Sequence, residues 1–135
     1  MALMQQHKYL EEIIDREDVV QNWFPGDKRE ECWHKQQAEY GFDDRETWSL
    51  DATFFQWLYE RLRMFKDIGG EVVDFNFYKF DVDGSKLTQL EIIDKMISNC
   101  EQIIKIKSDD IGGETAILEQ ETARLWSIVI PAMWW

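Results

Sequence analysis

The segment from Thr88 to Ile104 constrains the fold more than any other part of the sequence. Its apolar residues follow one another in steps of three, four, three and four, which is the spacing of one face of an α-helix. Thr88 and Glu91 precede this run with the spacing of a capping box, in which each residue satisfies a backbone amide of the other. The sequence therefore predicts a long amphipathic helix whose apolar face carries Leu90, Ile93, Ile97, Cys100 and Ile104.

Four further segments repeat this periodicity. They cover about residues 6 to 23, residues 27 to 40, a long segment with Leu50, Phe54, Trp57, Leu58, Leu62 and Phe65, and a last segment from about Glu114. Glycine and proline punctuate them at residues 24 to 27 and at Gly69-Gly70. With 135 residues the chain has the length of one domain. We therefore expect a mainly α single-domain bundle of about four to five helices, covering residues 1 to 135.

One segment differs in character, between about residues 71 and 84. Val73, Phe75 and Phe77 alternate with polar residues, and Asp83-Gly84 is a turn signal. We expect a short aromatic-rich β-hairpin or a loop inserted here between the helices.

The charge of the chain limits its partners. There are 27 acidic and 15 basic residues, which give a formal net charge of −12. Direct binding to nucleic acid or to an anionic membrane requires positive potential, so both are disfavoured. A basic protein surface or a metal ion is the natural partner, although a strong negative charge also serves solubility.

The sequence predicts neither a membrane-spanning segment nor a disulfide framework. No basic and apolar leader precedes the first segment, and no apolar run approaches the roughly 20 residues of a membrane span. Cys32 and Cys100 stand far apart without a metal-ligand spacing, so we expect free thiols in a reducing cytoplasm.

Catalytic patterns are weak. The turn around Gly84 has too few oxygen ligands for calcium, and His7 and His34 do not form a dyad with a nucleophile. We expect neither an enzyme nor a cofactor. The alternative is a metal-dependent nucleotide hydrolase, because two Glu-x-x-Asp pairs resemble those that hold Mg²⁺ on helices: Glu12, Asp15, Glu91 and Asp94.

Two acidic segments, residues 67 to 83 and 109 to 121, and the C-terminal tail are the candidate partner-binding regions. If the acidic segments converge, their carboxylates could imitate the phosphates of nucleic acid and occupy a basic groove, whereas the alternative is a set of solvated helix ends. The tail either folds back onto the core or docks in a partner or a second copy. The predicted partner-binding residues are Asp81, Asp83, Asp109, Asp110, Glu114 and Glu119, with Phe77, Tyr78, Trp134 and Trp135.

The densest motif, GFDDRETWSLD at residues 41 to 51, reads as structural. Gly41 suits the left-handed end of the preceding helix, and Asp43 can cap the next one near Glu46. We expect Trp48 and Leu50 to anchor this junction in the core, and Asp51 to form an ion pair with Arg45 or Arg61.

This motif also carries a resemblance. With the helix end around Arg61, Leu62, Phe65 and Lys66, and with Ile93 to Ile97, it resembles a family of small proteins from tailed bacteriophages. That family has a Gly-aromatic-Ser-Asp-x-Asp-x-Trp-x-Leu-Asp head, matched here by Gly41, Phe42, Asp44, Glu46, Trp48, Leu50 and Asp51. Asp43 replaces the usual serine, and Ile92 or a neighbour stands where the family often has tryptophan.

The resemblance implies a phage origin and a life in the cytoplasm of an infected host cell, without implying a reaction. The function we expect is that of a phage accessory protein that binds a host or anti-phage defence protein and inhibits or redirects it. Acidic mimicry of nucleic acid is one way in which it would do so. The remaining alternative is a structural or oligomeric phage component, including a homodimer joined by Trp134 and Trp135.

Overall fold

A computed structural model describes residues 25–27, 29–109 and 113–135. The helix predicted for residues 6 to 23 lies outside these residues, as do Glu12, Asp15 and Asp110. By their internal packing the residues form two compact units, one ending at Leu50 and the other beginning at Asp51. The prediction of a single domain stays a prediction.

The first unit contains helix α2, Glu30–Tyr40, which buries Cys32, Trp33 and Gln36. Gly41 ends this helix in the left-handed conformation, with φ of 83°, and its amide donates to the carbonyl oxygen of Gln37. A residue without Cβ adopts this conformation at little cost, so the predicted role of Gly41 is confirmed.

A short 3₁₀ turn, Asp44–Thr47, follows, and Asp43 caps it from an extended conformation. The capping interaction differs from the prediction in one respect. The carboxylate of Asp43 accepts from the amide of Arg45, whereas the Glu46 amide donates to the Asp43 carbonyl oxygen. The tighter 3₁₀ turn brings the second amide, rather than the third, to the capping side chain.

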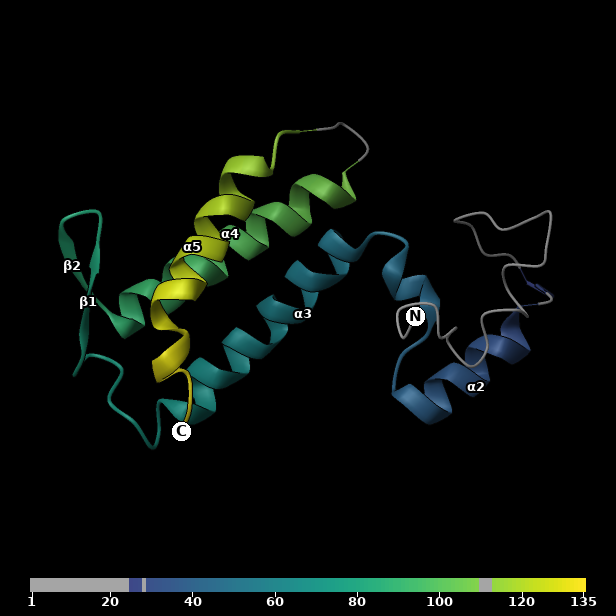
Figure 1. The fold of residues 1–135 in the computed structure, drawn as a ribbon, viewed down its shortest axis with the longest axis horizontal. Coiled ribbons are helices and arrows are strands. Elements are labelled where there is room, and N and C mark those ends of the chain that lie inside the picture. The colour runs from purple at the N-terminus through teal and green to yellow at the C-terminus, as the bar shows by residue number, and fades with distance from the viewer. Residues whose placement is uncertain (1–24, 28, 110–112) are drawn as a thin grey trace, which may run out of the picture. The chain divides into compact units, whose positions relative to one another are not determined.

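The second unit is built from three long helices and a hairpin. Helix α3, Leu50–Met64, continues into a π-helical turn at Phe65–Gly69. Helices α4, Gln89–Ser108, and α5, Ala116–Val129, pack side by side, and α3 runs along them (Figure 1). The predicted mainly α class is confirmed. None of the helices in the described ranges combines the length and the hydropathy that a membrane crossing needs.

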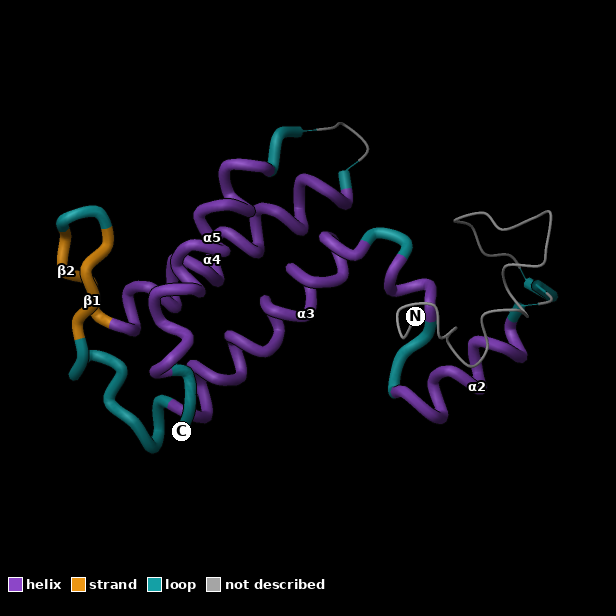
Figure 2. Tube along the Cα trace, in the orientation of Figure 1, coloured by secondary structure: helices purple, strands orange, loops and turns teal. Residues whose placement is uncertain are grey.

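The hairpin consists of β1, Lys79–Val82, and β2, Ser85–Thr88, joined by the turn Asp83-Gly84 (Figure 2). Both turn residues have positive φ, 52° and 84°, as a type I′ hairpin turn requires. The strands begin later than the predicted position near residues 71 to 84, because Phe75 is buried in the core and residues 71 to 78 form turns instead of a ladder.

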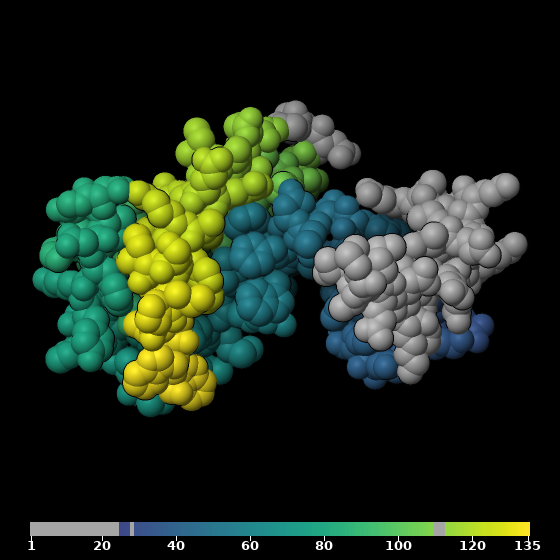
Figure 3. Space-filling model, in the orientation of Figure 1, coloured from purple at the N-terminus to yellow at the C-terminus, as the bar shows by residue number. Residues whose placement is uncertain are grey.

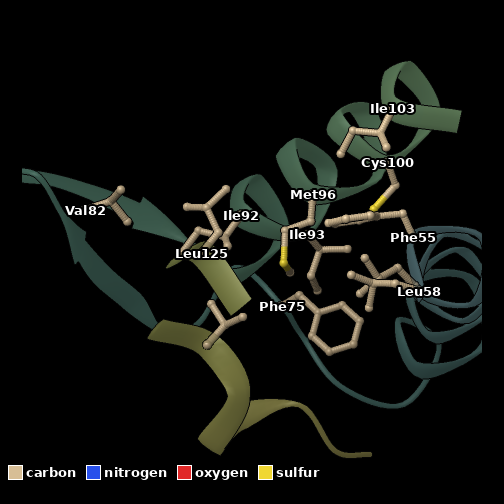
Figure 4. Close-up of a cluster of buried hydrophobic side chains, with 12 residues drawn as sticks. Phe55, Leu58, Phe75, Val82, Ile92, Ile93, Met96, Cys100, Ile103 and Leu125 are labelled. Carbon is tan, nitrogen blue, oxygen red and sulfur yellow. The ribbon is translucent and has the colours of Figure 1, made fainter. Parts of the chain in front are cut away.

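Helix α4 begins with the predicted capping box, since Thr88 Oγ1 accepts from the Glu91 amide at 3.1 Å and Glu91 Oε1 from the Thr88 amide at 3.2 Å. Its buried face meets α3, α5 and Phe75 in the core (Figure 4). The buried apolar residues of this core are Phe55, Leu58, Leu62, Phe75, Val82, Ile92, Ile93, Met96, Cys100, Ile103, Leu125 and Val129.

The face that α3 buries was predicted incorrectly in part. Leu58 and Leu62 are buried as expected, but Phe55 enters the core in place of Phe54 and Trp57. The side chain of Leu50 is 63% exposed, so it does not anchor the junction in the core. Apolar residues cover an arc of α3 wider than its contact with α4 and α5, and only packing selects the part of the arc that is buried.

Candidate protein-binding surface

The GFDDRETWSLD motif organises the first unit around buried charge. Arg29 is only 2% exposed and holds both carboxylate oxygens of Asp27, through Nε at 3.0 Å and Nη2 at 2.8 Å. Its guanidinium lies over the rings of Trp33 and Trp48, 5.0 and 5.6 Å from their centroids. Trp48 packs edge-on against Trp33. Trp48 is half-buried and packs in this stack of arginine and tryptophan, not in the hydrophobic core where it was predicted.

A second arginine completes this stack. The guanidinium of Arg45 lies 4.3 Å from the Trp33 ring centroid and forms two hydrogen bonds to the carboxylate of Asp43, at 2.6 and 2.9 Å. Burial raises the pKa of Asp43, but the hydrogen bonds from Arg45 and Gln37 outweigh it and leave this pKa below its ordinary value. The carboxylate is thus an ionised structural group.

Asp44 has the opposite behaviour. Burial raises its pKa, and the Trp33 indole only partly counteracts this rise. Trp33 Nε1 and Asp44 Oδ1 have no well-aligned hydrogen bond to a described residue, so we treat their contact as a weak one. Every charged group of the motif that is buried is therefore engaged in the stack or beside it, and the motif specifies the fold.

Asp51 is paired, but not with either predicted arginine. Its carboxylate accepts from Lys107 Nζ at 2.6 Å, and the same ammonium lies 3.1 Å from Glu119. The hydrogen bond from Lys107 lowers the pKa of Asp51. Arg61 instead stacks over Trp57, one turn earlier on α3, at 4.7 Å from the ring centroid.

Most of the predicted acidic binding residues have local partners. Asp81 pairs with Lys86 across the hairpin, and Asp83 pairs with Arg124 on α5. Glu119 accepts from Thr115 Oγ1 at 2.7 Å, in addition to its contact with Lys107. Glu114 accepts from the Ala116 amide, and Asp109 is exposed at the end of α4. These ion pairs reduce the free negative charge along the hairpin and α5.

Unpaired carboxylates gather instead where α3 ends. Asp67, Glu71 and Asp74 line a hollow of about 600 Å³, whose apolar wall includes Phe75 and Leu90. Within the part of the chain that the structure describes, these three acids form no ion pair, since Lys66 beside them pairs with Asp94 at 2.7 Å. The lining of the hollow therefore combines carboxylates with apolar side chains.

Two exposed aromatic pairs lie at the same end of this unit. Phe77 and Tyr78 are 73% and 60% exposed and pack edge-on against each other. Trp134 and Trp135 are 69% and 56% exposed in the tail, which reaches the end of α3 (Figures 1 and 3). The ring of Trp135 packs against Gly69, where an added Cβ would come within 2.8 Å of the indole. Phe75 lies against the same side of Gly69.

Gln89 joins the two pairs. Its amide donates to the carbonyl oxygen of Tyr78, and its buried side-chain Nε2 donates to the carbonyl oxygen of Ala132 at 3.0 Å and to Met133 Sδ at 3.6 Å. The backbone of the tail is therefore folded back, as one of the two predicted alternatives had it, while both tryptophan rings stay largely accessible. We call this surface the aromatic-acidic end: Phe77, Tyr78, Trp134, Trp135, Asp67, Glu71 and Asp74.

The predicted metal set is not assembled by the described residues. Glu91 is engaged in the capping box and Asp94 in its ion pair with Lys66, while Glu12 and Asp15 lie outside the described residues. Among residues 25–27, 29–109 and 113–135, no cluster of three or more histidine, cysteine or acidic side chains is arranged to hold a metal ion.

Comparison of this chain with protein families, with characterised proteins and with solved structures finds no match. The resemblance to a phage family accordingly stays a prediction. Sequence reasoning identified the aromatic residues of the aromatic-acidic end, but it did not single out Asp67, Glu71 or Asp74 within their acidic segment. It missed Gln89 entirely, because a glutamine at the first position of a helix carries no distinctive sequence signal.

Proposed function

We propose that this protein acts by binding another protein through the aromatic-acidic end, and that the partner presents a basic surface with an apolar centre. The observation that carries the proposal is the joint placement of two exposed aromatic pairs by one buried residue, Gln89, next to carboxylates that form no ion pair with any described residue. Exposed aromatic rings on a folded scaffold are typical of protein interfaces.

The two kinds of residue contribute differently to such binding. The aromatic rings supply apolar area, and large rings of this type dominate the affinity of many interfaces. The carboxylates and the overall charge of −12 attract a basic partner from a distance and accelerate association. The negative charge disfavours nucleic acid itself as the partner.

The partner class that fits best is a basic host or anti-phage defence protein, including a nuclease or another protein that binds nucleic acid, whose groove the acidic residues would occupy. The charge of the chain and the free carboxylates of the aromatic-acidic end support this part of the proposal. The local ion pairs of Asp81, Asp83 and Glu119 argue that mimicry, where it operates, uses the aromatic-acidic end more than the hairpin and α5.

The test begins with capture of a partner from a bacterial lysate, followed by affinity measurements with the purified partner at increasing salt. We expect binding to weaken as salt screens the attraction. Partner binding that is indifferent to salt contradicts the electrostatic part of the proposal. Replacement of Trp134 by alanine should weaken binding at every salt concentration, because it removes apolar contact area.

A matched pair of triple variants locates the surface. The first neutralises the aromatic-acidic end, with Asp67→Asn, Glu71→Gln and Asp74→Asn. The second removes the same charge elsewhere, with Glu101→Gln, Asp109→Asn and Glu114→Gln, all exposed. We expect the first to weaken binding at least tenfold more than the second. The reverse result would place the interface at the ends of α4 and α5, where Asp109 and Glu114 were predicted to bind.

A further inference from the structure

A second hollow lies where the hairpin meets the helices, outside the aromatic-acidic end. β1 packs against α5 and β2 against α4, and residues of all four elements line a space of about 310 Å³. Sites for small molecules usually measure roughly 300–1,000 Å³, so this volume suits a small ligand. We call it the hairpin hollow, and its lining includes Val82, Leu87, Lys95, Glu121, Arg124 and Leu125.

The apolar part of the hairpin hollow is continuous with the hydrophobic core. Val82 of β1 and Leu125 of α5 are core residues that are only 8% and 1% exposed (Figure 4). Leu87 of β2 is half-buried and packs against the same core. Side chains that belong to a packed core hold their positions without a ligand. The hollow is therefore preformed and offers a fixed apolar contact.

Arg124 contributes structure to the hollow more than it contributes free charge. Its Nη1 donates to the carboxylate of Asp83 in the hairpin turn, so this pair ties the hairpin to α5. The hydrogen bond to Asp83 raises the pKa of Arg124, and the nearby charge of Glu121 adds a smaller rise. The guanidinium is thus already engaged by the protein itself.

Lys95 and Glu121 are the charged groups of the hollow that remain for a ligand. Lys95 on α4 forms no ion pair with any residue that the structure describes. The carboxylate of Glu121 on α5 accepts from Asn99 Nδ2 at 3.2 Å, and this donor is neutral. Asn99 follows Lys95 by one helical turn, so the two lie on the same face of α4. An ammonium and a carboxylate therefore line one hollow from neighbouring helices without pairing with each other.

We propose that the hairpin hollow binds a free α-amino acid with an apolar side chain of about the size of leucine. The carboxylate of the ligand pairs with Lys95, and its ammonium pairs with Glu121. Its side chain packs on Val82, Leu87 and Leu125. The ligand thus bridges two opposite charges that the protein leaves apart, and it covers the apolar part of the lining.

Charge selects a zwitterion over a simple acid or a simple amine. A carboxylic acid satisfies Lys95 but brings a second negative charge next to Glu121, in a chain whose net charge is −12. An amine satisfies Glu121 but meets the ammonium of Lys95. A zwitterion places an opposite charge at each group and carries no net charge against the field of the protein. Recognition therefore depends on the two local charges together.

A ligand series tests this specificity. Methyl NMR of the full chain follows the signals of Val82, Leu87 and Leu125 during titration with L-leucine up to ten millimolar. We expect these signals to shift and to saturate. 4-Methylpentanoate lacks the ammonium of leucine and 3-methylbutylamine lacks its carboxylate, so each should bind at least tenfold more weakly. The absence of a saturable shift with leucine, or an analogue that binds as tightly as leucine, overturns the proposal.

Two substitutions with matched controls assign the charges. Lys95→Met should weaken leucine binding at least tenfold, to the level of 3-methylbutylamine. Glu121→Gln should weaken it by a similar factor, and the new side chain keeps an oxygen that accepts from Asn99. Lys105→Met and Glu101→Gln make the same charge changes at exposed positions of α4 outside the hollow, and should leave the affinity within about twofold. Equal effects of the substitutions and their controls overturn the assignment.

The proposed function and this proposal fail separately. None of the residues of the hairpin hollow belongs to the aromatic-acidic end, so loss of leucine binding in Lys95→Met should leave partner capture unchanged. Likewise, a chain that captures no partner can still bind leucine.

Discussion

The side-chain amide of Gln89 donates a hydrogen bond of 3.0 Å to the carbonyl oxygen of Ala132, 43 residues away in the sequence. Gln89 is the first residue of α4, and its own backbone amide holds the carbonyl oxygen of Tyr78. One buried side chain thus fixes the tail against the start of a helix, and with it the position of the two terminal tryptophans.

Replacement of Gln89 by leucine should release the tail. Leucine fills a similar volume but leaves the Ala132 carbonyl without its donor, which should lower the free energy of unfolding by about 1–3 kcal/mol. Denaturant unfolding measures this loss, and the indole NMR signals of Trp134 and Trp135 should move toward unfolded positions. Gln102→Leu removes an exposed glutamine that bonds only within the same helix, so it should change stability by less than about 0.5 kcal/mol. Equal effects of the two substitutions would refute the role of Gln89.

Gly69→Ala should displace Trp135 with little change in stability. The added Cβ would meet Trp135 Cδ1 at 2.8 Å and Phe75 Cζ at 3.1 Å, and the terminal ring can move away. Alanine also gains roughly 0.5–1 kcal/mol over glycine within a helix, which offsets the cost of the displacement. The indole N–H resonance of Trp135, assigned with a Trp135→Phe chain, should shift. In a Trp135→Ala background the added Cβ still meets Phe75 at 3.1 Å but no longer meets the indole ring, so the substitution should be better tolerated there than in the wild-type chain. An equal change in stability in the two backgrounds would argue against the contact with Trp135.

Asp43→Asn should destabilise the first unit, whereas Asp44→Asn should leave its stability nearly unchanged or raise it. The Asp43→Asn substitution removes a charge-assisted pair with Arg45, which should lower the free energy of unfolding of this unit by about 1–3 kcal/mol at neutral pH. Burial raises the pKa of Asp44, so its ionised form is disfavoured in the folded state, and a neutral amide should cost less than about 0.5 kcal/mol or stabilise. Unfolding of this unit, followed by the indole NMR signals of Trp33 and Trp48, compares the two substitutions.

The effect of Asp43→Asn should also depend on pH. Because the folded pKa of Asp43 is lowered, its contribution is present above the ordinary value of 3.8 and is lost as the pH falls through the lowered value. The stability difference between wild type and Asp43→Asn should therefore shrink in strong acid. A difference that is constant across this range would mean that the charge of Asp43 is not what stabilises the turn.

Burial raises the pKa of the Cys100 thiol from 9.0 to about 11. A group whose acid form is favoured in the folded state contributes stability that is present below its unfolded pKa and is lost as the pH rises toward the folded value. We expect Cys100 to cause a loss of up to about 2 kcal/mol between pH 9 and pH 11. The measurement is urea unfolding across this range, with Cys100→Ala as the comparison. The alanine chain should be less stable at pH 7 but should show a shallower decline, and parallel declines would contradict the assignment.

The sequence alone predicted the elements whose signals are local. The capping box of Thr88 and Glu91, the left-handed Gly41 and the Asp83-Gly84 turn each depend on residues a few positions apart, and each was found where it was predicted. Helical spacing likewise located α4 and α5. On α4, however, only Ile93 and Cys100 of the predicted apolar face are buried, and the core also takes Ile92, Met96 and Ile103, whereas Leu90, Ile97 and Ile104 are half-buried.

Tertiary structure decided what depends on distant segments. The apolar arc of α3 is too wide for periodicity to say that Phe55 enters the core while Trp57 stays exposed. Lys107, rather than a nearby arginine, neutralises Asp51 because α4 passes beside the start of α3. The aromatic-acidic end exists only because Gln89 bonds to residues before it and after it in the chain, and no local pattern encodes a hydrogen bond across 43 residues. Sequence spacing fixes which side chains share a helix face, whereas the packing of helices determines which of those faces remain free to bind.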